Sequence, residues 1–227
     1  MTGATVASES AQQRIRRGLV AEVLTRTGGV VDPQVVAGPP LASTGLRTTV
    51  RGVADDSGRF GFRRRRSHEV IAVDACLIAH PMVVDIIESS SFAPGASVMI
   101  RVGARTGEAM VVVGPHKQGA RVPDGVILVG ENELESGRRV WLHEEVAGRT
   151  WRVSARSFFQ ASPEGAEALV TAVRAGIAAH APDATRLVDL CSGVGLFAGT
   201  LGEGRSVVGV ERSAAAVADA RHNLADR

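Results

Sequence analysis

The sequence has only two cysteines and no long apolar run, and each shortage argues against a class of protein. Cys76 and Cys191 are too few for a disulfide framework, so we expect a reducing compartment, the cytoplasm. No run of about 18 uninterrupted apolar residues occurs, which argues against a membrane-spanning helix. The first ten residues, MTGATVASES, lack the basic start and apolar centre of a secretory signal.

Lysine is almost absent as well. Lys117 stands alone against 25 arginines, while the net charge is only +2. Codon bias in a GC-rich genome explains such a ratio without any function. Arginine is also better suited than lysine to binding phosphate and to stacking on bases, so the location of the arginines has to decide between the two explanations.

The first two thirds of the chain divide into a helix, a loop and a series of strands. Residues 11–27 have apolar side chains at helical spacing, and the proline-rich run 32–45 is a linker. From 46 to 150, strand patterns follow one another without room for crossover helices, which predicts an antiparallel sheet. The turn residues 55–58 predict a hairpin between the first two strands.

From residue 151 the pattern is α/β. Ser162 and Pro163 are typical of a helix start, and strand, loop, helix, strand and helix follow in 186–227. This order is the first half of a doubly wound, Rossmann-like sheet. We therefore predict an α/β chain with an N-terminal helix and linker (1–45), a central antiparallel-sheet domain (46–150) and a partial Rossmann-like domain (151–227).

The loop after the strand Arg186–Leu190 is the most informative segment. Gly193 and Gly195 allow a ligand to approach the main chain near a helix start, and Glu211 follows the next strand, where a carboxylate can bind both hydroxyls of a ribose. Asp189, just before the loop, favours S-adenosylmethionine, whose amino acid moiety methyltransferases commonly place near an acid. A dinucleotide site, a purely structural turn and a loop-capping role for Asp189 are the alternatives.

Two sets of residues carry a resemblance to a known family. The sequence SFFQ at 157–160, followed by a helix and by D-L-x-x-G-x-G-x-F at 189–197, resembles the signature of the RNA (uracil-5-)-methyltransferases. The segment GRFGFRRRRSHEVIAVDACLIAHP resembles the central domain of the same family. The resemblance covers about 11–227 and implies that Gln160, Cys191 and Glu211 contact S-adenosylmethionine. Phe158 and Phe159 are expected in the core.

The sequence departs from this family in three respects. The upstream cysteines of an iron–sulfur cluster are missing, so we expect no cluster and interpret Cys76 as a buried thiol. An N-terminal barrel-like RNA-binding domain is also missing. The Asp-Pro-Pro-Arg strand end, the nucleophilic cysteine and the general base of the family are all expected beyond Arg227, so no catalytic residue is assigned here.

The arginines concentrate between residues 47 and 66. Arg47, Arg51, Arg63 and Arg65 are our candidates for RNA contacts, with strand alternation placing Arg63 and Arg65 on one face. A solvated edge strand protected from aggregation is the alternative. His68 is expected to be a hydrogen-bonded structural residue.

These features predict methyl transfer from S-adenosylmethionine to C5 of uridine in rRNA or tRNA. Neither Cys76 nor Cys191 is expected to be the nucleophile, so the reaction would need a separate chain that completes the methyltransferase domain. An inactive RNA- or S-adenosylmethionine-binding remnant is the alternative, and a truncated product without a role is a third. We also expect that Val207, Val208 and Val210 are not all buried.

Overall fold

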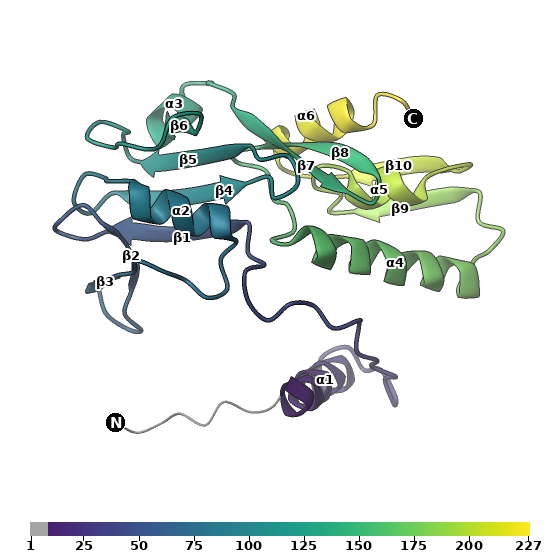
Figure 1. The fold of residues 1–227 in the computed structure, drawn as a ribbon. Helices are drawn as coiled ribbons and strands as arrows, with labels where there is room; N and C mark the ends of the chain where they lie inside the picture. The colour runs from purple at the N-terminus through teal and green to yellow at the C-terminus, as the bar shows by residue number, and fades with distance from the viewer. Residues whose placement is uncertain (1–8) are drawn as a thin grey trace. The chain divides into compact units, whose positions relative to one another are not determined.

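A computed structural model describes residues 9–227 as two compact units, one ending at Pro40 and the other beginning at Leu41 (Figure 1). In the first unit, α1 (Glu9–Arg26) confirms the predicted helix, and Gly29 follows it with φ 66°. The guanidinium of Arg17 donates to the carbonyl of Val35 at 2.9 Å, which ties the following loop to the helix. Within residues 9–227, no helix is both long and apolar enough to cross a membrane.

The second unit begins with a six-stranded sheet in the order β3-β2-β1-β4-β5-β6. Its strands are β1 (Thr49–Ala54), β2 (Phe60–Arg63), β3 (Val70–Ala72), β4 (Ser97–Val102), β5 (Ala109–Gly114) and β6 (Ile127–Gly130). Four of the five pairs are antiparallel, as predicted. The pair β5–β6 is parallel, and there the prediction is wrong, because an irregular connection over 115–126 replaces a crossover helix.

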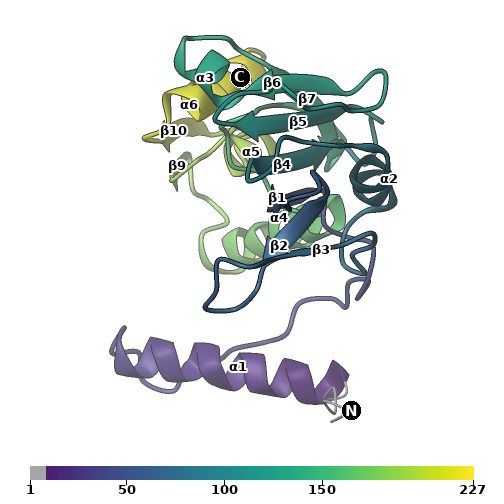
Figure 2. The same cartoon turned by 90° about the vertical axis from the view of Figure 1, so that its left-hand side faces the viewer.

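Local chemistry explains the predicted hairpin and the helix that covers the sheet. Oδ1 of Asp55 accepts hydrogen bonds from the amides of Ser57 and Arg59, which closes the β1–β2 turn. Helix α2 (Pro81–Ser89) starts after His80, whose ring nitrogen accepts from the amide of Met82. Figure 2 shows α2 against one face of the sheet, where its apolar residues join the first core cluster.

A hairpin and a second core connect this sheet to the α/β part. Strands β7 (Trp141–Val146) and β8 (Arg149–Ser154) follow the short helix α3 (Glu131–Glu135). Trp151 of β8 is fully buried in the second core cluster, together with residues of β5, α4 and α5. The predicted boundary at 150 falls within β8, and residues on both of its sides share one core. The division into domains 46–150 and 151–227 stays a prediction.

The α/β part has the predicted order. Helix α4 (Pro163–His180) is capped by Ser162, whose hydroxyl accepts from the amide of Gly165 at 3.1 Å. Strand β9 (Arg186–Leu190), α5 (Leu196–Leu201), β10 (Ser206–Val210) and α6 (Ala214–Asn223) follow. β9 and β10 pair in parallel, which confirms the start of a doubly wound sheet. Val208 and Val210 are exposed and Val207 is half-buried, as expected.

Candidate functional site

The loop between β9 and α5 has a compressed, left-handed backbone. Cys191, Gly193 and Gly195 have φ values of 63°, 55° and 93°. A left-handed conformation costs a residue with a Cβ atom roughly 1–2 kcal/mol, so Cys191 is held there by its surroundings. The amide of Ser192 donates to the carbonyl of Val210 at 3.0 Å, and this bond fixes the loop beside the end of β10. The Cys191 residue itself is exposed.

Asp189 stabilises the helix that follows the loop. Its Oδ2 accepts a hydrogen bond from the amide of Ala198, in the first turn of α5, at 3.2 Å. Burial raises the pKa of this carboxyl, and the Ala198 amide only partly offsets that effect. The capping role that the sequence left open for Asp189 is therefore present in the structure.

Glu211 joins the loop to the segment after β10. Its Oε1 accepts from the amide of Ser213 at 2.7 Å, and its Oε2 accepts from the amide of Gly193 at 2.9 Å. These amides, Ser213 first, lower the pKa of Glu211, so the carboxylate stays charged at neutral pH. Each carboxylate oxygen has a second lone pair, so Glu211 can still accept hydrogen bonds from a ligand.

The segment 157–161 lies beside this loop. A Cβ atom placed on Gly193 would lie 3.9 Å from the carbonyl oxygen of Phe158. The carbonyl of Ala161 accepts from the amide of Thr48 at 2.8 Å, which also anchors the segment to the start of β1. Gln160 is half-buried within it. The structure thus brings the segment that carries Gln160 next to Gly193, whose amide donates to Glu211.

The prediction for Phe158 is wrong, whereas that for Phe159 holds in part. Phe158 is 70% exposed, because the polar anchors at Ser157 and Ala161 turn its side chain away from the second core. Phe159 is half-buried and packs against that core.

Sequence reasoning missed the residue that holds segment 157–161 in place. Asp219 of α6 is 0% exposed, and its carboxylate accepts from the hydroxyl of Ser157 at 2.6 Å and from the guanidinium of Arg152 at 2.9 Å. One turn later, Asn223 accepts from the amide of Arg152 and donates to the carbonyl of Val194. The spacing of Asp219 and Asn223 places both on one face of α6, which was the only signal in the sequence.

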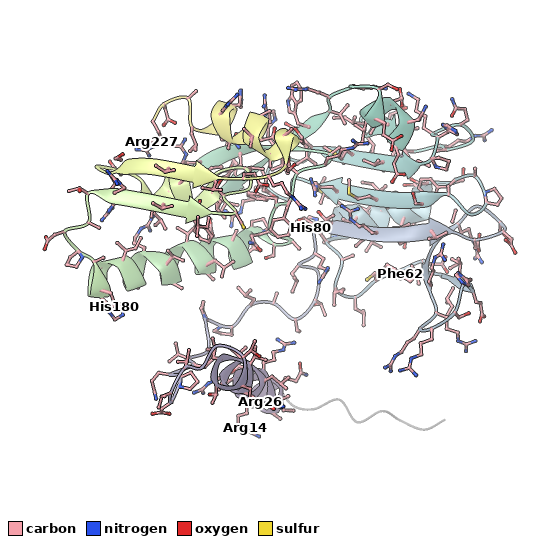
Figure 3. All side chains as sticks on the ribbon, turned by 180° about the vertical axis from the view of Figure 1, so that it is seen from behind. Arg14, Arg26, Phe62, His80, His180 and Arg227 are labelled. Carbon is pink, nitrogen blue, oxygen red and sulfur yellow. The ribbon has the colours of Figure 1, made fainter. Side chains whose placement is uncertain are left out.

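A basic cavity of about 470 Å³ opens next to the same segment. Arg47 and Arg51 line it together with Phe158 and two arginines that sequence reasoning missed, Arg101 and Arg156. Phe62, labelled in Figure 3, and Cys76 complete part of its wall. Cys76 is half-buried and packs against the first core, so the expectation of a buried thiol holds in part.

Arg101 is the most constrained of these cations. It is 5% exposed and donates to the hydroxyl of Thr49 at 3.2 Å and to the carbonyl of Ser154 at 2.9 Å. Burial lowers its pKa to about 10, and the nearby charge of Arg51 adds to this effect. It remains protonated at neutral pH and contributes positive potential to the cavity.

Arg63 and Arg65 do not join this cavity. Strand β2 ends at Arg63, and residues 64–68 form a turn in which Arg66 has φ 59°. Strand alternation therefore does not extend to Arg65, and that expectation is wrong. The guanidinium of Arg63 lies 3.0 Å from Nδ1 of His68, which agrees with a structural role for His68.

No model of a known protein family matches the chain. It is 35% identical to an uncharacterised RNA methyltransferase of Streptomyces coelicolor, over 96% of this chain and 53% of the relative. It is 34% identical to another from Streptomyces avermitilis, over 96% of this chain and 56% of the relative. The chain thus spans about half the length of the curated relatives that it matches.

A solved structure has the same fold. The tRNA (uracil-54, C5)-methyltransferase of Pyrococcus abyssi, solved with S-adenosyl-L-homocysteine, matches with a TM-score of 0.67 and 20% identity. The match covers 94% of this chain and 59% of that protein. At this identity the match establishes the α/β fold.

Proposed function

We propose that this chain, which is similar along 96% of its length to an uncharacterised RNA methyltransferase of Streptomyces coelicolor, binds S-adenosylmethionine and RNA for methyl transfer to C5 of uridine in rRNA or tRNA. The observation that carries this proposal is the position of Glu211. Its carboxylate spans the amides of Gly193 and Ser213, at the ends of two parallel strands where a doubly wound sheet binds its ligand.

The proposed cofactor site consists of this loop and segment 157–160. Glu211 would accept hydrogen bonds from the ribose hydroxyls through its free lone pairs. The left-handed residues Cys191, Gly193 and Gly195 would let a ligand approach the backbone closely, and Gln160 lies on the adjoining segment. Asp189 would act mainly by holding α5, with its carboxyl close to the same strand end. Bound S-adenosylmethionine would supply the methyl group.

The proposed RNA site is the 470 Å³ cavity beside segment 157–161. Arg47 and Arg51 would neutralise phosphates, and the exposed ring of Phe158 offers a surface on which a base can stack. The cofactor site and the RNA cavity share this segment, as a transfer reaction between two bound substrates requires. Arg63 and Arg65 would make at most outlying contacts, since they lie on the β2–β3 turn.

Methyl transfer to uracil C5 requires a thiolate that adds to C6 and a base that later removes the C5 proton. Cys191 lies in the cofactor loop, and Cys76, although it lines part of the RNA cavity, is half-buried against the first core. We therefore infer that neither of these cysteines supplies the nucleophile.

The test is the 5-methyluridine content of RNA in cells with and without the gene. Nucleosides from purified tRNA and rRNA are quantified separately by mass spectrometry, and the deletion strain is complemented with wild type or Glu211→Ala. We expect one fraction to lose 5-methyluridine, with rescue by wild type only. Unchanged 5-methyluridine in both fractions would contradict the transfer function, and S-adenosylmethionine binding in that case would indicate an inactive remnant.

A further inference from the structure

A second basic cavity adjoins the first. It has a volume of about 320 Å³ and lies between the turn 137–140, the β7–β8 hairpin and the start of α6. Among its lining residues are Arg138, Arg139, Trp141, Arg152 and Arg156. We propose that this cavity, here called the hairpin groove, binds the sugar–phosphate backbone of the RNA next to the nucleotide that enters the first cavity; this inference rests on the proposed function.

Arg156 gives the two cavities a shared wall. It lines the first cavity with Arg47 and Arg51, and it lines the hairpin groove with Arg139 and Arg152. Positive side chains therefore continue from one cavity into the next. A single nucleic acid strand carries a phosphate at every nucleotide, so a continuous basic surface matches its charge better than two isolated sites would.

The arginines of the groove differ in how far their charge is already neutralised. Arg138 pairs with Glu133, and Arg152 pairs with the buried Asp219. Arg139 is exposed and has no hydrogen-bond or ion-pair partner among residues 9–227. Arg156 is exposed, and its ion-pair carboxylate, Glu135, lies 3.9 Å away, at the limit of an ion pair. Arg139 and Arg156 thus remain available to phosphates.

The same groove offers a place for a base. The guanidinium of Arg152 lies 5.1 Å from the centre of the Trp141 ring, and its bond to Asp219 holds it there. Trp141 is nevertheless 39% exposed. Helix α6 lines the groove with alanines, at positions 214, 215 and 218. An exposed aromatic ring beside several arginines is the combination by which proteins hold single-stranded nucleic acid.

The experiment measures binding of the full chain to a fluorescent single-stranded RNA of mixed sequence, by anisotropy, between 50 and 200 mM salt. The variant Arg139→Ala, whose arginine lines the groove but not the first cavity, is compared with the matched control Arg174→Ala, whose arginine lines neither cavity. We expect the groove variant to bind about threefold more weakly, with a salt slope lower by about 0.7, since each lost phosphate contact removes about 0.7 for a single strand. A further variant, Arg47→Ala/Arg51→Ala, measures the contribution of the first cavity to RNA binding.

The outcomes separate this inference from the function on which it rests. Equal affinity and salt slope for the groove and control variants, with a loss for Arg47→Ala/Arg51→Ala, would overturn the groove alone. Absence of RNA binding by the wild type would overturn the groove and the RNA part of the proposed function together. Calorimetry with S-adenosylmethionine on the groove variant, expected to match wild type, shows that its fold and cofactor site are intact.

Discussion

The carboxylate of Asp219 in α6 accepts a hydrogen bond from the hydroxyl of Ser157, with the two oxygens 2.6 Å apart. The same carboxylate accepts from the amide and the hydroxyl of Ser154, so one buried charge fixes the end of β8 and the start of segment 157–161. That segment carries Gln160 and Phe158, which we assign to the cofactor and to RNA. Asp219 therefore couples both proposed sites to the helix that follows Glu211.

Loss of this carboxylate should destabilise the fold. In Asp219→Ala, the guanidinium of Arg152 and the hydroxyl of Ser157 lose their buried partner, and breaking such a buried pair costs roughly 3–5 kcal/mol of unfolding free energy. Urea denaturation followed by circular dichroism measures it. Asp56→Ala, on an exposed turn, is the control and should change the free energy by less than about 0.5 kcal/mol. Similar values for the two variants would contradict the structural role of Asp219.

Replacing either of two helical glycines with alanine should change the stability of the protein, but in opposite directions. A Cβ atom on Gly199 would lie 2.6 Å from the Trp151 ring and 2.9 Å from Leu224, so Gly199→Ala overpacks the second core at a cost of about 1–3 kcal/mol. A Cβ atom on Gly176 of α4 would have no atom within 4 Å apart from the backbone of its own helix. Gly176→Ala should therefore raise the free energy of unfolding by about 0.5–1 kcal/mol. Thermal unfolding of both variants, compared with wild type, measures these changes in stability. A Gly199→Ala protein as stable as wild type would contradict this packing of α5 on β8.

The ion pair between Arg105 and Glu167 should make stability depend on acid pH. The hydrogen bonds from Arg105 lower the pKa of Glu167 from 4.5 to about 2. Because the folded-state pKa is the lower one, the stabilisation is present above about pH 4.5 and is lost as the pH falls towards 2. The stability difference between wild type and Glu167→Gln should therefore shrink across this window in urea titrations. A difference that stays constant from pH 7 to pH 2.5 would contradict the pair.

The contribution of Asp189 to stability should depend on pH in the opposite direction to that of Glu167. Burial raises its pKa, so its contribution to stability is present below its unfolded-state pKa and is lost as the pH rises through the folded-state value. Asp189→Asn keeps an oxygen for the amide of Ala198, and at pH 7 it should be at least as stable as wild type. Asp189→Ala removes the cap of α5 and should cost about 1 kcal/mol. A marked loss of stability in Asp189→Asn at pH 7 would show that the charge itself is needed for folding.

The sequence was most informative where the structure depends on neighbouring residues. The strand, loop and helix around Gly193, the cap at Ser162 and the turn at Asp55 all arise from local patterns, and all were predicted. The parallel pair β5–β6 was missed, because no crossover helix marks it. The exposure of Phe158 and the role of Asp219 depend on contacts between residues more than 60 positions apart, which periodicity does not report.

The central claim is that the loop after β9 and Glu211 form an S-adenosylmethionine site. Isothermal titration calorimetry of the full chain with S-adenosyl-L-homocysteine, the stable product form, tests it most directly. We predict saturable binding at one site per chain, weakened at least about tenfold in Glu211→Ala, since two charge-assisted hydrogen bonds are lost. Glu211→Gln, which retains one acceptor oxygen, should be intermediate. No binding by the folded wild type, or equal affinity in Glu211→Ala, would contradict the claim.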